Sequence, residues 1–541
     1  MEHLDKKRKV TIMIAIMAAL LFASINQTIV STALPKIIAT LGGMEYYSWV
    51  FTIYMLTSSI TTILVGRLSD LYGRKPFILI GIGVFVTGAF LSGTSSTIFH
   101  LITYRAIQGI GAGMIMSTSF TAVGDLFSPR ERGRWQGLLS AVFGLSSVFG
   151  PTLGGYIVDH ADWHWVFWVF LPFGIIAFLM ILFLFPSVPH RKGESVDYYG
   201  SLFLTLFMVP LLLAFSWAGT TYAWGSAQII SLFAGAAVSL LIFILIERKA
   251  RGPVLPVHLF KNSVFTLSNL AAFTMGAGMF GAIMYMPTFI QGVMGTSATY
   301  SGYITMPMTL SLVAGSTLSG QLISKTGKYK IQAILGLAVM ACGMFAMSTM
   351  GTHTTTLTAI LYMILVGFGL GIGMPVFTLT VQNVVQPSEL GVATTASQLF
   401  RNIGGTIGVS VMGTVMAHKT SEKLVETMAG IKDKLSQLDP VTAKKLEVFE
   451  NTQALLDADK IKHISKSLPA DVHIVFDQLI AAVREAMSYA LSGVFFTGAA
   501  IVTIAVVLTI FLKELPLRGS APSSKKNMGK MHSLREHPPQ G

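Results

Sequence analysis

Residues 66–76 read Gly66-Arg-Leu-Ser-Asp-Leu-Tyr-Gly-Arg-Lys-Pro76 and form a short charged stretch between two long apolar runs. In the second half of the chain, Gly320-Gln-Leu-Ile-Ser-Lys-Thr-Gly-Lys-Tyr-Lys330 repeats its spacing of Gly, Leu, Gly and a basic residue. A second echo pairs Gly111-Ala-Gly-Met114 with Gly371-Ile-Gly-Met374. These repeats predict two related halves, each built from the apolar runs around its charged stretch.

The composition places these halves in a membrane. Of the 541 residues, 52% are hydrophobic and only 12% are charged, with 52 Gly, 28 Met and a mean hydropathy of +0.65. Soluble proteins carry about a quarter charged residues. This balance excludes a disordered chain, nucleic-acid-binding modules and a string of soluble enzyme domains. A single Cys excludes a disulfide framework, a cysteine zinc site and an iron–sulfur cluster.

The apolar runs predict an all-α polytopic membrane protein with 14 transmembrane helices, because each run has the roughly 20 mostly apolar residues that a span needs. The first run follows four basic residues but is too long for a signal peptide. The runs lie near residues 11–34, 47–66, 77–96, 98–123, 136–158, 164–185, 199–218, 226–246, 265–291, 300–323, 331–350, 355–381, 394–418 and 489–512.

The basic residues predict the orientation. Arg and Lys gather in the segments after spans 2, 4 and 8, whereas the short loops on the other side hold only Lys36. By the positive-inside rule, the basic segments and both termini are cytoplasmic. The formal net charge of +13 then reflects topology and attraction to an anionic inner leaflet, and no nucleic-acid partner is expected.

Spans 1–6 and 9–14 are expected to form two bundles, with spans 7 and 8 inserted between them. The predicted segments are a cytoplasmic tail at 1–10, a six-helix bundle at 11–185, a linker with two inserted helices at 186–264, a second six-helix bundle at 265–512, an extracellular insert at 419–488 and a basic cytoplasmic tail at 513–541. The polar insert shows helical spacing of apolar residues, which predicts two or three amphipathic helices. It is either a solvated cap or a gate or docking surface. The tail from Ser520 is expected to be disordered.

Four motifs in this order resemble those of the major facilitator superfamily, and more narrowly its fourteen-spanner drug:proton antiporters. They lie at residues 28–35 in span 1, 66–76 after span 2, 101–109 in span 4 and 144–155 in span 5. The resemblance extends from about residue 10 to 515. It implies the major facilitator fold, with two pseudo-symmetric six-helix bundles plus two inserted helices, and proton-coupled export.

Two of these motifs are candidate moving parts. The charged loop is expected to form a latch on the inward gate, or else a helix cap with orienting positive charges; its residues are Gly66, Arg67, Asp70, Gly73, Arg74 and Lys75. In span 5 the small residues let a neighbouring helix approach and the proline breaks the hydrogen-bond ladder. This seam either biases the cycle toward export or is plain helix packing; its residues are Gly150, Pro151, Gly154 and Gly155.

Arg105 is the most informative candidate in the membrane. An Arg inside a span costs roughly 2.5–3.5 kcal/mol on insertion scales and normally faces a cavity or a partner. At about 1.5 Å per residue, Arg105 lies about 10 Å below the outer boundary and Asn26 about 22 Å above the inner one. Both therefore lie in the outer third of a roughly 30 Å core. We expect a substrate or coupling site there, formed by Asn26, Gln27, Arg105 and Gln108, with Tyr104 nearby.

A second intramembrane Arg lies in span 13. By the same arithmetic Arg401 is about 10 Å above the inner boundary, with Gln398 and Asn402 beside it. It is expected either to steer an anionic group of a substrate or to hold a helix seam.

Asn26 departs from the antiporter motif, which usually opens with Asp. No Asp or Glu lies well inside any span. A cavity without carboxylates is expected to disfavour organic cations and to accept neutral, zwitterionic or anionic amphiphiles. The proton site is then expected in the outer loop between spans 5 and 6, at Asp159, Asp162 and His164, unless this is an ordinary polar loop.

Together these features predict a plasma-membrane secondary exporter of amphipathic antibiotics or toxic compounds, coupled to protons and acting as a monomer in the lipid bilayer. The Gly-rich stretches lie inside spans and lack a phosphate-loop ending, so no ATP site is expected, nor any cofactor or metal. The alternatives are export of a lipid or endogenous metabolite, a membrane-embedded transferase, and a sensor or assembly protein that does not transport.

Overall fold

The computed structural model describes residues 5–41, 47–186, 197–218, 222–250, 253–296, 298–436 and 472–517, with a few positions between 437 and 471. The predicted disordered tail from Ser520 lies outside the described residues, as does most of the predicted insert between 437 and 471.

The described part is helical, and fourteen of its helices have at least 14 residues. The all-α membrane fold class predicted from the sequence is thereby confirmed. The first half comprises α1 (Lys6–Leu41), α2 (Tyr47–Tyr72), α3 (Arg74–Gly93), α4 (Ile98–Leu126), α5 (Pro129–His160), the short α6 (Trp165–Trp168) and α7 (Leu171–Leu184). The inserted helices are α8 (Tyr198–Trp217) and α9 (Ala227–Glu247).

The second half follows a 3-10 turn, η2 (Val257–Lys261). It comprises α10 (Ser263–Thr288) with a π-helical end η3 (Phe289–Val293), α11 (Ala298–Thr326), α12 (Lys330–Ser348), α13 (Thr356–Asn383), η4 (Pro387–Glu389), α14 (Leu390–Ser436) and α17 (His473–Ile510).

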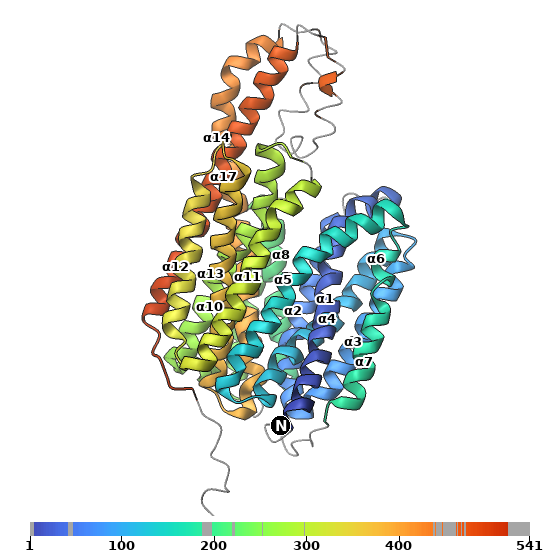
Figure 1. The fold of residues 1–541 in the computed structure, drawn as a ribbon, viewed down its shortest axis with the longest axis vertical. Helices are drawn as coiled ribbons and strands as arrows, with labels where there is room; N and C mark the ends of the chain where they lie inside the picture. Colours follow the sequence, from blue (N-terminus) through green and yellow to red (C-terminus); the bar gives the residue numbers. More distant parts are fainter. Residues whose placement is uncertain are drawn as a thin grey trace, which may run out of the picture.

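The two halves pack by the same rule. In the first half α1 packs on α5, α2 and α3 pack on α4, and α7 packs on α1 and α3. In the second half α10 packs on α14, α11 and α12 pack on α13, and α17 packs on α10 and α12. The halves meet through α5 against α11 and α2 against α14, which are equivalent pairs. Figure 1 shows the two columns approaching each other at the end where α1 begins, which we call the base, and diverging away from it.

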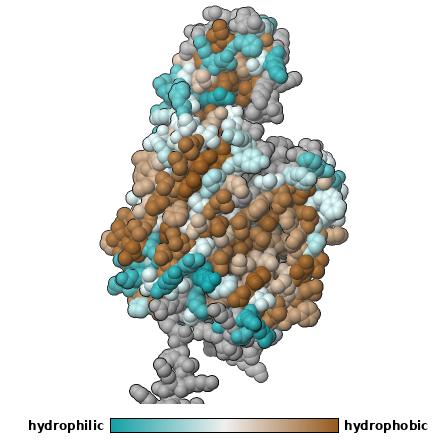
Figure 2. Space-filling view, viewed as in Figure 1, coloured by the Kyte–Doolittle hydropathy of each residue, from teal (hydrophilic) through white to brown (hydrophobic). Residues whose placement is uncertain are grey.

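The described helices differ in how apolar they are, and three of the less apolar ones lie between the halves. Eleven of the described helices are long and apolar enough to cross a membrane. The long helices outside this group are α2, α11 and α14, all of which belong to the contacts between halves. Figure 2 shows hydrophobic side chains over the middle of one face and hydrophilic ones toward its ends, as a bilayer requires.

Side-chain caps fix several helix starts. Asn262 Oδ1 accepts hydrogen bonds from the amides of Val264 and Phe265, and so begins α10. Thr97 caps α4 and Thr355 caps α13 in the same way. Capping groups of these types satisfy backbone donors that a helix start leaves unpaired, which explains where these spans begin.

The α14 and α17 helices continue far beyond the bundle and form the projection at the top of Figure 1. With 47 residues, α14 is roughly 70 Å long, more than twice a bilayer core. The parts of the predicted insert within α14 and α17 are therefore continuations of two spans. Met428 on α14 and Phe476 on α17 are buried, so the projection has an apolar core of its own.

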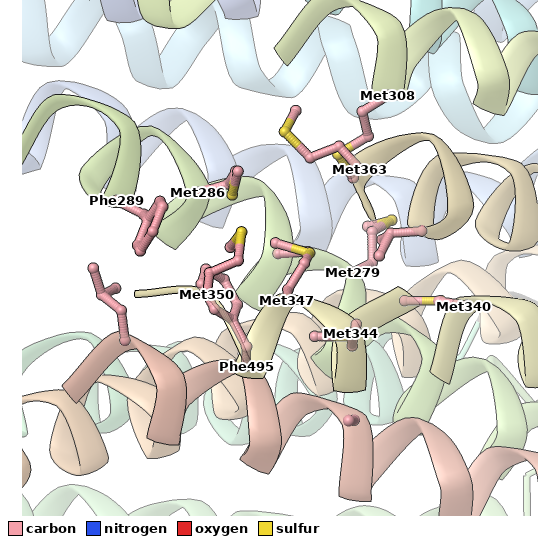
Figure 3. Close-up of a cluster of buried hydrophobic side chains, with 14 of the residues drawn as sticks. Met279, Met286, Phe289, Met308, Met340, Met344, Met347, Met350, Met363 and Phe495 are labelled. Atoms are coloured by element: carbon pink, nitrogen blue, oxygen red, sulfur yellow. The ribbon is translucent and has the colours of Figure 1, made fainter. Parts of the chain in front are cut away.

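The cores of the two halves differ in kind. The second half contains a dense cluster of buried methionines (Figure 3): Met279, Met286, Met308, Met340, Met344, Met347, Met350 and Met363, packed with Phe289 and Phe495. The main core of the first half consists of Ile, Phe, Ala, Leu and Val, with Tyr54 and one buried Met, Met13. Because the unbranched thioether chain adopts many shapes at low cost, the second half is the more adaptable one.

The repeated glycines of the sequence motif have matching structural roles. Gly73 and Gly327, the second Gly of each repeat, have φ values of 88° and 71°, which favour glycine. The first glycines lie in the contacts between halves. A Cβ at Gly320 would lie 2.5 Å from the Gly133 carbonyl oxygen on α5, and Gly66 lies against Thr395 on α14.

We expect Gly320→Leu to force α5 and α11 apart and to destabilise the protein by about 1–3 kcal/mol, as overpacking does. The midpoint of thermal unfolding in detergent measures this loss. Gly302→Leu is the matched control, because Gly302 lies on the same helix and a Cβ there would meet no atom within 4 Å. Equal midpoints for the two variants would contradict the prediction.

Candidate functional site

The charged motif, expected as a loop, forms the end of α2 and the start of α3 with only Gly73 between them, and it is folded into a compact ion-paired cluster at the base. Arg74 forms ion pairs with Asp70 and, at 2.9 Å, with Asp125 of α4, and it donates a hydrogen bond to Ser69 Oγ at 2.5 Å. The side chains of Asp70 and Arg74 are 2% and 4% exposed. Because one guanidinium holds two carboxylates, the loop is fixed to the ends of both α2 and α4.

Asp70 also connects the two halves. Its Oδ1 and Oδ2 accept hydrogen bonds from the amides of Gly391 (3.1 Å) and Val392 (3.2 Å) in the first turn of α14. The start of a helix carries partial positive charge, so a carboxylate stabilises this contact. The structure thus brings Gly66, Asp70, Gly73 and Arg74 of the predicted gate motif together. The side chain of Arg67 lies outside the described part, and Lys75 is half-buried.

Burial raises the pKa of Asp70 to about 6, because desolvation disfavours the charged carboxylate; Arg74 and the amide of Val392 act in the opposite direction. If the base opens and water reaches Asp70, its pKa returns toward the ordinary value of 3.8. The closed base therefore binds this proton more tightly than an open base does.

The second half has a different cap at the base. Glu514 Oε1 accepts hydrogen bonds from the amides of Tyr329 (3.0 Å) and Lys330 (3.3 Å), where α12 begins. The amide of Leu515 donates to Tyr329 Oη at 2.8 Å. A carboxylate from the far end of the chain therefore holds the loop that repeats the first motif. The repeat gives no sign of this residue, which the sequence analysis missed.

In the membrane core, Asn26, Arg105 and Gln108 form a single hydrogen-bonded network, and each has an exposed fraction of 0%. Arg105 Nη1 donates to Gln108 Oε1 at 2.7 Å, and Gln108 Nε2 donates to Asn26 Oδ1 at 2.7 Å. Asn26 of α1 and Arg105 of α4, which were expected at the same depth in the membrane, are thus connected through Gln108. We keep the role of this network as a hypothesis.

The remaining residues expected near Arg105 point elsewhere, and one partner was missed. Gln27 Nε2 donates to Met55 Sδ at 3.6 Å, and the Tyr104 ring lies 6.0 Å from the ring of His100. Instead, Tyr54 of α2 contacts the cation, with its ring centroid 4.2 Å from Arg105 Cζ. A lone Tyr in an apolar run carries no signal that separates it from ordinary core aromatics.

Arg401 lies about 16 Å along α14 from the base. It is half-buried, its stem packs on Gly276 of α10, and it has no hydrogen bond or ion pair within the described part of the chain. Gln398 Nε2, one turn nearer the base, is buried and also lacks a partner there. This pattern leaves donors available near the middle of the second half.

The small residues of α5 let α1 approach closely. Gly150 lies against Thr28, whose hydroxyl donates to the Ser146 carbonyl at 2.8 Å, and a Cβ at Gly154 would lie 2.7 Å from the Ile29 carbonyl oxygen. The motifs of spans 1 and 5 thus contact each other inside the first half. Gly155 and Pro151 belong to the same helix, and their side-chain surroundings lie outside the description.

The loop between α5 and α6 pairs two of the three residues expected there. Asp162 Oδ1 lies 2.5 Å from His164 Nδ1, and both side chains are accessible, at 61% and 31%. The hydrogen bond from His164 holds the pKa of Asp162 below its usual range. The side chain of Asp159 is outside the described part. Across the residues that the structure describes, no cluster of His, Cys, Asp and Glu fits a metal ion.

Two matching helical halves that join at the base, with a polar network buried among α1, α2 and α4 of the first half, define a membrane transporter and not an enzyme. The chain belongs to the Major Facilitator Superfamily, whose family model matches residues 16–409. The predicted family and fold are confirmed.

Similar proteins agree with this assignment. The chain is 37% identical to the multidrug transporter protein MdtP of Bacillus subtilis over 98% of both chains. It is 32% identical to multidrug resistance protein 3 of the same organism, over 95% of this chain and 97% of that protein. Among solved structures, the human organic anion transporter MFSD10 superposes with a TM-score of 0.60 at 15% identity, covering 93% of this chain and 99% of that one, which shows the shared fold.

We expect closure of the base to strengthen as the pH falls from about 6 toward 4, because the closed form holds the Asp70 proton more tightly. Distances between spin labels at Tyr72→Cys and Lys325→Cys, in a chain carrying Cys342→Ser, measure closure. Asp70→Asn is expected to remove most of this pH dependence. A pH dependence that is unchanged in Asp70→Asn would contradict the prediction.

Proposed function

We propose that this protein is a secondary exporter of the plasma membrane that removes amphipathic toxic compounds, including antibiotics, in exchange for protons. The names of its relatives, a multidrug transporter and a multidrug resistance protein in Bacillus subtilis, support this substrate range. The basic segments favour a cytoplasmic base, since Arg74 and the 3-10 turn residue Lys261 lie on that side.

The observation that carries the proposal is the joining of the halves at the base. Ser316 Oγ donates to the Gly137 carbonyl at 2.8 Å, and Asp70 caps α14 at the equivalent contact. With a cytoplasmic base, this arrangement faces outward. Rocking of the two halves about the site between them then alternates access, and the Asp70–Arg74 cluster is the latch of the inward gate.

Proton coupling has two candidate sites. Asp70 binds its proton more tightly when the base is closed, so its protonation and the outward-facing form favour each other. The accessible Asp162 and His164 pair is the second candidate. Asp70 is favoured because it touches both halves and changes its surroundings in the cycle.

The charges of the membrane core favour neutral, zwitterionic or anionic compounds. Arg105 and Arg401 are intramembrane cations, and within the described residues the carboxylates Asp70 and Asp125 are held by Arg74 at the base. An organic cation would be desolvated without a countercharge, which is unfavourable.

A second candidate function is export of an endogenous metabolite. The chain is 29% identical to the rubrofusarin-specific efflux pump aurT of Gibberella zeae, over 94% of this chain and 90% of that protein. A pump of this kind would show one preferred compound in transport assays in place of a broad range.

Purified protein in lipid vesicles tests the function directly. With an imposed pH gradient, we expect movement of an acidic fluorescent antibiotic that stops when an ionophore collapses the gradient. A quaternary ammonium dye should move poorly. Strong transport of the dye without the acid would contradict the substrate class, and transport that ignores the gradient would contradict proton coupling.

We expect Arg401→Gln to lower export of acidic compounds by at least about tenfold, equivalent to about 1.4 kcal/mol, and to leave neutral compounds little changed. Initial rates in the same vesicles measure this. Arg248→Gln, at the exposed end of α9, is the matched control. Equal losses for acidic and neutral compounds would show that Arg401 only holds the helices together.

A further inference from the structure

The network of Asn26, Gln108 and Arg105 has a fixed direction. A guanidinium can only donate, so Arg105 requires the oxygen of Gln108 to face it. The amide nitrogen of Gln108 must then donate, and it does so to Asn26 Oδ1. This order leaves the Asn26 amide nitrogen at the end of the hydrogen-bonded network, with two N–H groups that need an acceptor.

This nitrogen and two further polar atoms beside the network lack a hydrogen-bond partner among the described residues. Asn26 Nδ2, Arg105 Nη2 and Tyr54 Oη are buried and have no hydrogen-bond partner there. Arg105 Nε reaches the Val50 carbonyl only at 3.5 Å. Leaving a buried donor unsatisfied costs about 1–3 kcal/mol, so three such groups, on Arg105, on Tyr54 against it and on Asn26 at the other end of the network, indicate that an occupant belongs beside them.

The cluster also lacks a negative charge. Tyr54 offers Arg105 only the face of its ring. Of the carboxylates described in the helices and loops of the first half, Asp70 and Asp125 pair with Arg74, Asp162 pairs with His164, and Glu131 accepts from Ser128. A buried cation without a countercharge is unfavourable by several kcal/mol. The α1 helix has no Asp or Glu between Lys6 and Leu41, so it supplies no countercharge.

We propose that Asn26, Arg105 and Tyr54 form a binding site for one small monovalent anion, with chloride as the ligand. The anion accepts hydrogen bonds from Asn26 Nδ2, Arg105 Nη2 and Tyr54 Oη, and it neutralises the guanidinium. Exposed fractions of 0% at all three residues favour an ion of halide size over the carboxylate of an exported compound.

The chemistry of the site distinguishes chloride from water. A water molecule accepts two hydrogen bonds and also needs acceptors for its own two protons, and the free groups at this site include the donor-only Arg105 and the donor end of Asn26. A halide accepts from every side and also supplies the charge.

Equilibrium binding of radioactive chloride to the purified, detergent-solubilised protein tests the proposal. Gluconate keeps the ionic strength constant. We expect saturable binding of one chloride per chain. Asn26→Asp should weaken it at least about tenfold, because the new carboxylate repels the anion and supplies the countercharge itself. Tyr54→Phe removes one donor and should weaken binding severalfold. Asn402→Asp, the same change in α14, should retain the affinity.

Absence of saturable binding in the unmodified protein overturns the proposal, as does unchanged affinity in folded Asn26→Asp. Size-exclusion chromatography checks folding, and Tyr54→Phe gives an independent reading if Asn26→Asp is unstable. Binding is measured without transport, so either result leaves the proposed export function to its own assay.

Discussion

The structure depends on how closely its two halves approach at the base. Gly66 on α2 and Gly320 on α11 occupy equivalent contacts: Gly66 lies against the Thr395 side chain of α14, and Gly320 lies against the Gly133 backbone of α5. At the first contact Asp70 adds a charged cap on α14. The contact between the halves at the base thus depends on the absence of side chains at the glycines and on the charge of the carboxylate. A change in either would alter this same contact.

The sequence predicted the two related halves because the glycine motif of the first half is repeated in the second. The spacing of Gly66 and Gly73 returns at Gly320 and Gly327, and the second glycines have positive φ in both places. Depth arithmetic on single helices also placed Asn26 and Arg105 at one height, where Gln108 now connects them.

The partners from distant segments were not predictable in this way. Tyr54 lies on α2 and contacts Arg105 of α4, and Glu514 follows α17 and caps the start of α12. Only the tertiary packing of these segments determines such partners. The insert was predicted to hold two or three amphipathic helices, and α14 and α17 run into it from the bundle without a break. A polar stretch can continue a helix as well as end it, because helix formation tolerates Lys and Glu once the helix leaves the bilayer.

The continuity of α14 has a mechanical consequence. A rod roughly 70 Å long that is held at Gly391 behaves as a lever. A tilt of about 10° at its foot sweeps its far end through about 12 Å, a displacement far larger than any side-chain adjustment at the joint. The far end of α14 therefore moves much more than its foot, and a fluorophore attached there would report each tilt of the helix.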